Sequence, residues 1–221
     1  MSKECAVAGC TATTSGHSTH CERHKRAQRR HGHPEQDGVT VHELQPFRDR
    51  VAARRAKNPT NHAWDILRQR WAAVAANAAM LLKAHAGGKP GAAYTVQAAH
   101  HIQRLAATVP DDVVMEAALA LFLMREAQPY RFRSDRAFDF QLSRRVRALS
   151  DVNAGTYFDH ETGKTKRVYR DVLPGTLIAL AEPLKAAFGV AGVYLAELDR
   201  RDERSKAAKK MELISALKEM V

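Results

Sequence analysis

The sequence of 221 residues predicts a mainly α-helical protein with an N-terminal zinc finger, a helical bundle that contains one short β-hairpin, and a long C-terminal helix. Three observations support this fold class. All three cysteines lie near the N-terminus, apolar residues recur at helical spacing through most of the chain, and strand-like alternation is confined to a segment near residues 156–170. We expect a zinc finger at residues 1–36, a helical domain at 37–190 and a C-terminal helix at 191–221.

The spacing of the cysteines predicts the metal site. Four residues separate Cys5 from Cys10, and ten more precede Cys21. Cys21 and His24 are three residues apart, which places both on one face of a helix. Structural zinc sites take four Cys or His ligands in a tetrahedron, and a short Cys…Cys turn that faces a Cys-x-x-His pair supplies them. We therefore expect these four side chains to bind a structural zinc ion.

The finger helix, with the sequence CERHKRAQRRHG, is expected to stop at Gly32, with Pro34 just beyond it. Other imidazoles nearby offer alternatives to His24 as the fourth ligand: His17, His20, His31 and His33. An odd number of cysteines in metal-like spacing, without a secretory signal, indicates a reducing compartment, and we expect a cytoplasmic protein.

The N-terminal cysteine and histidine pattern resembles a known type of zinc finger. The Cys-x4-Cys turn, a loop rich in Gly, Ser and Thr, and a Cys-x-x-His pair followed by Arg30, Gly32 and Pro34 look like the small treble-clef-like fingers of bacteriophage proteins. The resemblance covers only about the first 34 residues. It implies zinc and a nucleic-acid context, without specifying one activity.

The charge of the chain favours a polyanionic partner. The formal net charge is +11 and the pI is near 9.9, and nucleic acid is the commonest polyanion in a cell. The finger helix concentrates basic side chains that we expect to contact phosphates: Arg23, Lys25, Arg26, Arg29 and Arg30. A second basic face is expected between Arg50 and Lys57 on the following helix.

The bundle begins with VHELQPFRDRVAARRAKN, in which Pro46 belongs to the first turn or breaks the helix. Thr60 or Asn61 is expected to cap the next helix. Its apolar residues recur every three or four positions and form a core stripe that includes Trp64, Leu67, Trp71, Val74 and Ala78.

The segment TVQAAHHIQRLAAT predicts a further helix, and PDDVVMEAALALFLMRE predicts the central helix of the bundle because apolar residues almost surround its axis. Its start is marked by Pro110 and by two aspartates that interact favourably with the helix dipole. Ser134 is expected to cap a helix whose arginines face outward, namely Arg144, Arg145 and Arg147.

The segment TYFDHETGKTKRVYRDV then predicts a β-hairpin around a Glu-Thr-Gly-Lys turn. In the chain that follows, a helix is expected to bend or break at Pro183, and residues 189–192 to form a loose joint. A charged neck at residues 199–206 precedes an apolar stripe that consists of Met211, Ile214, Leu217 and Val221. Such a stripe favours docking to a partner helix or self-association, and folding back on the chain's own domain is the alternative.

The sequence contains no assembled catalytic motif, so we expect a protein that is not an enzyme. The finger, the basic composition and the charged terminal helix together make the whole chain resemble the recombination directionality factors of actinophage large serine integrases. That resemblance implies a serine integrase as partner, with DNA contacted directly or through the integrase complex. A zinc-finger DNA-binding or transcription regulator is the alternative, and an HNH-like nuclease is a more distant one.

Overall fold

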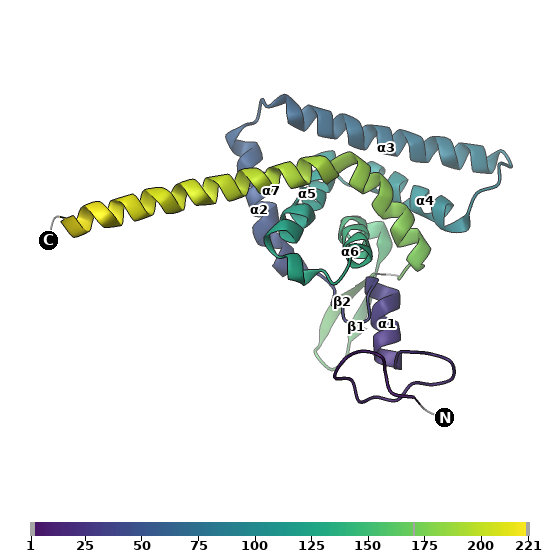
Figure 1. Cartoon of the computed structure of the whole chain (residues 1–221). Helices are drawn as coiled ribbons and strands as arrows, with labels where there is room; N and C mark the ends of the chain where they lie inside the picture. Colours follow the sequence, from purple (N-terminus) through teal and green to yellow (C-terminus); the bar gives the residue numbers. More distant parts are fainter. Residues whose placement is uncertain (1–2, 170, 220–221) are drawn as a thin grey trace.

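A computed structural model describes residues 3–169 and 171–219 of the chain. Within these residues the protein is mainly helical, with one two-stranded antiparallel sheet, so the predicted fold class is confirmed (Figure 1). The elements follow in the order α1 Glu22–His31, α2 Val41–Lys57, α3 His62–Ala86, α4 Ala93–Thr108, α5 Asp111–Ala127, α6 Asp135–Arg147, β1 Ala154–Asp159, β2 Lys164–Tyr169 and α7 Pro174–Glu219, with short 3-10 turns at Pro129–Arg131 and Asp151–Asn153.

Helix α5 is the centre of the bundle, as its apolar sequence predicts. Every residue from Val114 to Met124 is buried except Glu116. The helix packs against α2, α6 and α7, and α3 and α4 complete the bundle. Apolar burial on all sides is the main stabilising contribution to such a fold, because each fully buried large side chain contributes about 1.5–3 kcal/mol relative to exposure.

Polar side chains set the helix starts. Thr40 forms a capping box with Glu43 at the start of α2, Asn61 caps α3, and Ser134 caps α6. Helix α2 continues through Pro46 without a break.

Helix α7 is continuous where the sequence predicts a joint. Pro183 lies inside the helix, and Figure 1 shows that the first part of α7 runs in a different direction from the long outer part. The residues near 189–192 are helical rather than a loose joint. Gly192 is required there for packing, because a Cβ atom at this position would lie 2.4 Å from Cβ of Phe122 on α5.

The outer part of α7 leaves the bundle, and residues 200–215 are exposed (Figure 1). Its charged neck is held against α2 by ion pairs. Arg54 binds Asp199 at 2.8 Å and Asp202 at 2.7 Å. Arg50 binds Glu203 at 3.3 Å. Two residues of the predicted second basic face, Arg50 and Arg54, are therefore paired with the neck, while Arg55 pairs with Asp112 of α5 at 3.0 Å.

By length and composition alone, residues 174–215 of α7 could span a membrane, with a mean hydropathy of 1.4 in the most apolar window. From the sequence we expect no membrane partner, because no apolar run approaches about 18 residues. The early part of the helix packs against α4, α5 and α6, where Leu177, Leu180, Leu184 and Phe188 are fully buried. This burial is typical of a core helix.

The hairpin has the predicted position. Strands β1 and β2 pair from Ala154 with Tyr169 to Asp159 with Lys164. The Asp159 carboxylate accepts a hydrogen bond of 2.7 Å from the Thr162 hydroxyl and closes the turn.

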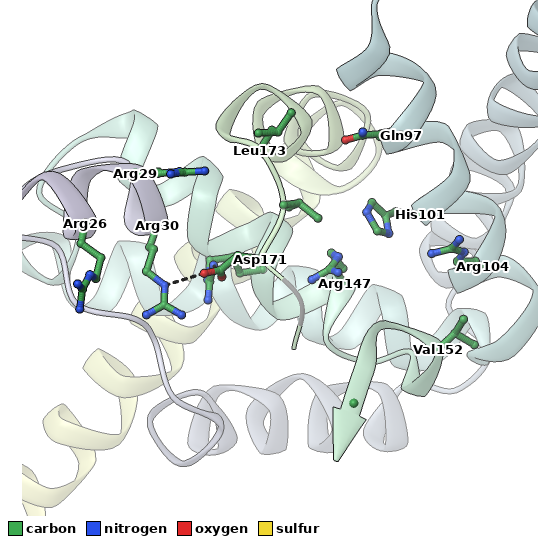
Figure 2. Close-up of a pocket in the computed structure, with 13 residues that line it drawn as sticks. Arg26, Arg29, Arg30, Gln97, His101, Arg104, Arg147, Val152, Asp171 and Leu173 are labelled. Atoms are coloured by element: carbon green, nitrogen blue, oxygen red, sulfur yellow. Dashed lines mark hydrogen bonds and ion pairs between the residues drawn. The ribbon is translucent and has the colours of Figure 1, made fainter. Parts of the chain in front are cut away.

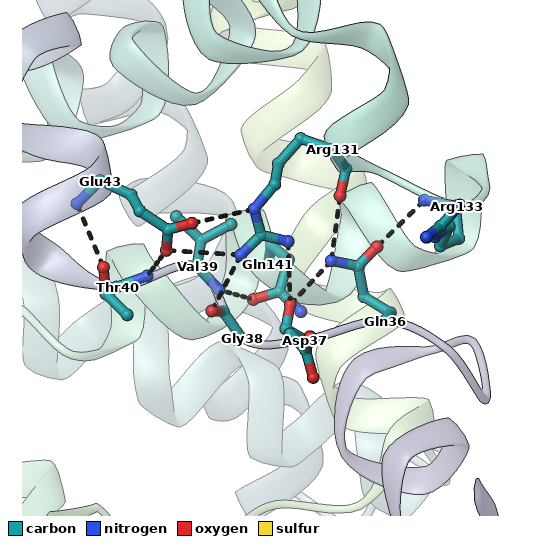
Figure 3. A network of polar contacts seen from close by, with 9 residues as sticks. All are labelled: Gln36, Asp37, Gly38, Val39, Thr40, Glu43, Arg131, Arg133 and Gln141. Carbon is teal, nitrogen blue, oxygen red and sulfur yellow. Dashed lines mark hydrogen bonds and ion pairs between the residues drawn. The ribbon is translucent and has the colours of Figure 1, made fainter.

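The segment between the finger and α2 is fixed to the bundle by a polar network (Figure 3). Gln36 is 1% exposed, and its side chain donates to the Arg131 carbonyl at 3.2 Å and accepts from the Arg133 amide at 3.0 Å. The Val39 amide donates to the buried Gln141 side chain at 2.9 Å. These buried amides are hydrogen-bonded to the bundle, and the bonds hold the segment between the finger and α2 against it.

Candidate metal centre

The chain brings together the four predicted zinc ligands. Donor atoms of Cys5, Cys10, Cys21 and His24 all lie within 4.8 Å of one another. An antiparallel bridge between Glu4 and Thr13 closes the loop that carries the first two cysteines.

Local backbone geometry places the sulfur atoms. The Cys5 amide donates to the Ala12 carbonyl at 3.0 Å, which fixes the start of the loop. Gly9 has a φ of 76°, which turns the chain immediately before Cys10. Cys21 is the N-cap residue of α1, so His24 follows on the first turn and faces the same side.

The separations fit a tetrahedral zinc ion. Zinc–sulfur bonds of about 2.3 Å place two ligand atoms about 3.8 Å apart. The Cys10 and Cys21 sulfurs are 4.0 Å apart. The Nδ1 atom of His24 lies 3.2 Å from the Cys5 sulfur and 3.4 Å from that of Cys21. His24 would therefore coordinate through Nδ1, and the geometry leaves no ligand position that a substrate requires.

Hydrogen bonds favour a thiolate at Cys5 even though the residue is buried. Cys5, Cys21 and His24 are buried, and Cys10 is partly buried. The Cys21 amide donates to the Cys5 sulfur at 3.4 Å. Burial opposes ionisation of Cys5, but hydrogen bonds from the Cys21 and Val7 amides and from His24 outweigh it and lower the pKa of the thiol from 9.0 to about 6.

The pKa of the Cys10 thiol is shifted in the opposite direction. A backbone hydrogen bond at Ala12 lowers its pKa, but desolvation and the neighbouring thiols of Cys5 and Cys21 outweigh that bond, so the pKa is raised. Adjacent thiolates repel one another, and the positive charge of a bound divalent cation offsets this repulsion, so that all its sulfur ligands can be ionised. The donor set therefore fits a structural metal ion, and zinc is the metal that such Cys and His sets usually hold.

The alternative histidines lie outside the cluster of donor atoms. His31 contacts Gln141 at 3.2 Å, His20 contacts the Thr19 hydroxyl at 3.0 Å, and the Glu35 amide donates to His33 at 3.2 Å.

The basic side chains of α1 divide into two groups. Lys25 pairs with Glu22 at 2.7 Å, and Arg23 lies beside the metal cluster. Arg26, Arg29 and Arg30 line a cavity of about 930 Å³ between the finger helix and the bundle (Figure 2).

Sequence reasoning missed the remaining walls of this cavity. They include three further arginines and a buried histidine: Arg104, Arg144, Arg147 and His101. The predicted outward orientation is wrong for Arg147, which is only 7% exposed. These residues come from α4 and α6, and spacing along the sequence carries no signal that α1 packs beside them.

The proposed partner stripe lies on the outer part of α7. Met211 is 66% exposed and Ile214 is 37% exposed, and Leu213, which the sequence analysis did not select, is 61% exposed. Leu217 belongs to the helix, but its side chain lies outside the described part of the structure, as does the whole of Val221.

Comparisons with protein-family models, curated proteins and solved structures find no match to the chain. The molecule is therefore characterised by its own geometry: a mainly helical fold with a Cys3His cluster that could hold a metal ion.

Proposed function

We propose that this protein is a non-catalytic, zinc-stabilised accessory factor that docks on a helical partner through the outer part of α7. The observation that carries the proposal is the projection of this helix away from the bundle, with Met211, Leu213 and Ile214 exposed to solvent (Figure 1). Apolar side chains at helical spacing on a free helix fit a groove or another helix.

Within this class, the resemblance of the chain to recombination directionality factors favours a large serine integrase as the partner. The integrase would recognise the attachment sites, and this factor would bind the integrase, change the association of its coiled-coil segments, and promote excision over integration. A helix is a suitable ligand for a coiled coil, because both present apolar side chains at the same spacing. The site of action would be the cytoplasm of a bacterial host, if a phage encodes the chain.

A DNA-binding or transcription regulator is the second candidate. It is favoured by the concentration of basic side chains on α1, of which Arg23, Arg26, Arg29 and Arg30 are exposed. In this case the finger would contact DNA phosphates directly.

The test is recombination in vitro with the serine integrase encoded in the same genome. The wild-type chain should bind this integrase and allow recombination between the left and right attachment sites. Met211→Asp combined with Ile214→Asp should weaken the complex by orders of magnitude, because each buried apolar side chain contributes about 1.5–3 kcal/mol. The thermal stability of the free chain should hardly change.

A charge-matched control is available on the same helix, outside the apolar stripe. Arg201→Ala combined with Lys209→Ala lowers the net charge by two, as the two new aspartates do, and both side chains are exposed. This control should retain binding and excision. Docking through α7 is wrong if the Met211 and Ile214 variant folds and still promotes excision, and the apolar stripe belongs to the chain's own fold if that variant unfolds.

A further inference from the structure

The arginine-lined cavity is built from distant parts of the chain. Helix α1 contributes one wall, α4 another, and α6 the floor, while residues 171–173 cross between them (Figure 2). Six arginines line it: Arg26, Arg29, Arg30, Arg104, Arg144 and Arg147.

Positive charge in the cavity exceeds negative charge. Asp171 is the one acidic residue among its described lining residues. Its carboxylate already binds Arg30 at 2.9 Å and Arg144 at 3.1 Å. Within the described chain, no acidic side chain forms an ion pair with Arg26, Arg29 or Arg104. A cavity with this imbalance concentrates anions.

At the floor of the cavity, neighbouring guanidinium groups repel one another electrostatically. Arg147 is 7% exposed, and burial together with nearby Arg144 lowers the pKa of its guanidinium. Like charges inside a partly enclosed space repel one another more strongly than at an open surface. A multivalent anion relieves this repulsion, and arginine binds phosphate with two parallel hydrogen bonds.

The other walls of the cavity offer contacts for the organic part of a ligand as well as for its charge. Gln97 and His101 of α4 add polar groups, while Val152 and Leu173 add apolar surface. The volume of about 930 Å³ lies within the range of small-molecule sites.

We propose that this cavity binds a ligand that carries several phosphate groups. The phosphates belong either to a nucleoside polyphosphate or to a nucleic-acid strand, since both present closely spaced phosphates beside a base. The inference is independent of docking through α7, because no residue of the outer helix lines the cavity.

Isothermal titration of the zinc-containing protein distinguishes the two sources. The probes are inorganic triphosphate, ATP, and a short oligonucleotide in single-stranded and duplex form. Binding of triphosphate and ATP supports a nucleotide site. Binding of an oligonucleotide, with an affinity that falls steeply with salt, supports a nucleic-acid site.

The test variant is Arg26→Ala combined with Arg104→Ala, which removes exposed arginines from opposite walls. Hydrogen bonds to charged groups account for a loss of about tenfold to hundredfold in affinity for each arginine. The matched control is Arg70→Ala combined with Arg201→Ala, because these exposed arginines lie outside the cavity and remove the same charge. Arg29→Glu is a second cavity variant if the double variant misfolds.

The proposal predicts that the cavity variant loses affinity while the control retains it, and that both keep their zinc. Two results would overturn it. One is that none of the probes binds at physiological salt. The other is an equal loss in cavity and control variants, which would mean that net charge alone attracts the phosphates.

Discussion

The contact between α5 and α7 depends on one glycine and makes a quantitative prediction. A Cβ atom at Gly192 would lie 2.4 Å from Cβ, 2.6 Å from Cγ and 2.9 Å from Cδ2 of Phe122. Favourable carbon–carbon contacts lie at about 3.5–4.0 Å. Because the nearest atoms are at the root of the Phe122 side chain, a rotamer change cannot move all of them away, and the two helices must separate by about 1 Å.

Two opposing effects determine how Gly192→Ala changes the free energy of unfolding. Overpacking a core costs about 1–3 kcal/mol, whereas replacing glycine by alanine inside a helix stabilises by about 1 kcal/mol. Phe122 is 6% exposed and packs on Phe138 with ring centroids 5.1 Å apart, so its side chain has little room to move away. We expect Gly192→Ala to lower the free energy of unfolding by about 1–2 kcal/mol.

Gly189→Ala, one turn earlier on the same helix, is the control. Its added Cβ would meet Phe122 at 3.6 Å, which is ordinary contact, so this variant should be neutral or more stable than the wild type. Urea denaturation followed by circular dichroism measures both changes. A Gly192→Ala protein as stable as Gly189→Ala would refute the close packing of α7 on α5.

Two further predictions concern local interactions. Burial, with help from Arg144 and Arg30, lowers the pKa of His31 from 6.5 to about 4, so the unfolded chain binds more protons between these values and stability should fall as pH falls from 6.5 to 4. This loss of stability should reach about 1–2 kcal/mol at pH 5. In urea titrations, the stability of His31→Gln should depend less steeply on pH than that of the wild type. If both proteins show the same pH dependence, His31 is not the group responsible. Thr40→Ala removes the cap of α2 and should cost about 1 kcal/mol by thermal denaturation, whereas exposed Thr60→Ala should cost little; equal effects would reject the cap.

Periodicity was sufficient to predict the helices. The apolar positions of α3 and α5, the caps at Asn61 and Ser134, and the stop at Gly32 all follow local rules that the structure confirms. The joint predicted at residues 189–192 was wrong, because a glycine in a helix also permits close helix packing, and only the partner Phe122 distinguishes the two roles.

The candidate sites were predictable to different degrees. The metal cluster lies within 20 residues of sequence, so spacing and ligand chemistry were enough to identify its members. The arginine-lined cavity was not predictable, since Arg26, Arg104 and Arg147 meet only through tertiary packing. For the same reason, the pairing of Arg54 with the charged neck of α7 could not be inferred from either segment alone.

The central claim is that Cys5, Cys10, Cys21 and His24 hold a structural zinc ion. The most direct measurement is the metal content of the purified protein by mass spectrometry, for the wild type and for Cys21→Ser. We predict about one zinc per wild-type chain, and loss of zinc with faster amide exchange in the first 34 residues for Cys21→Ser, while the bundle beyond residue 60 stays folded. A wild-type protein that contains no metal, yet protects its finger amides from exchange, would contradict the account.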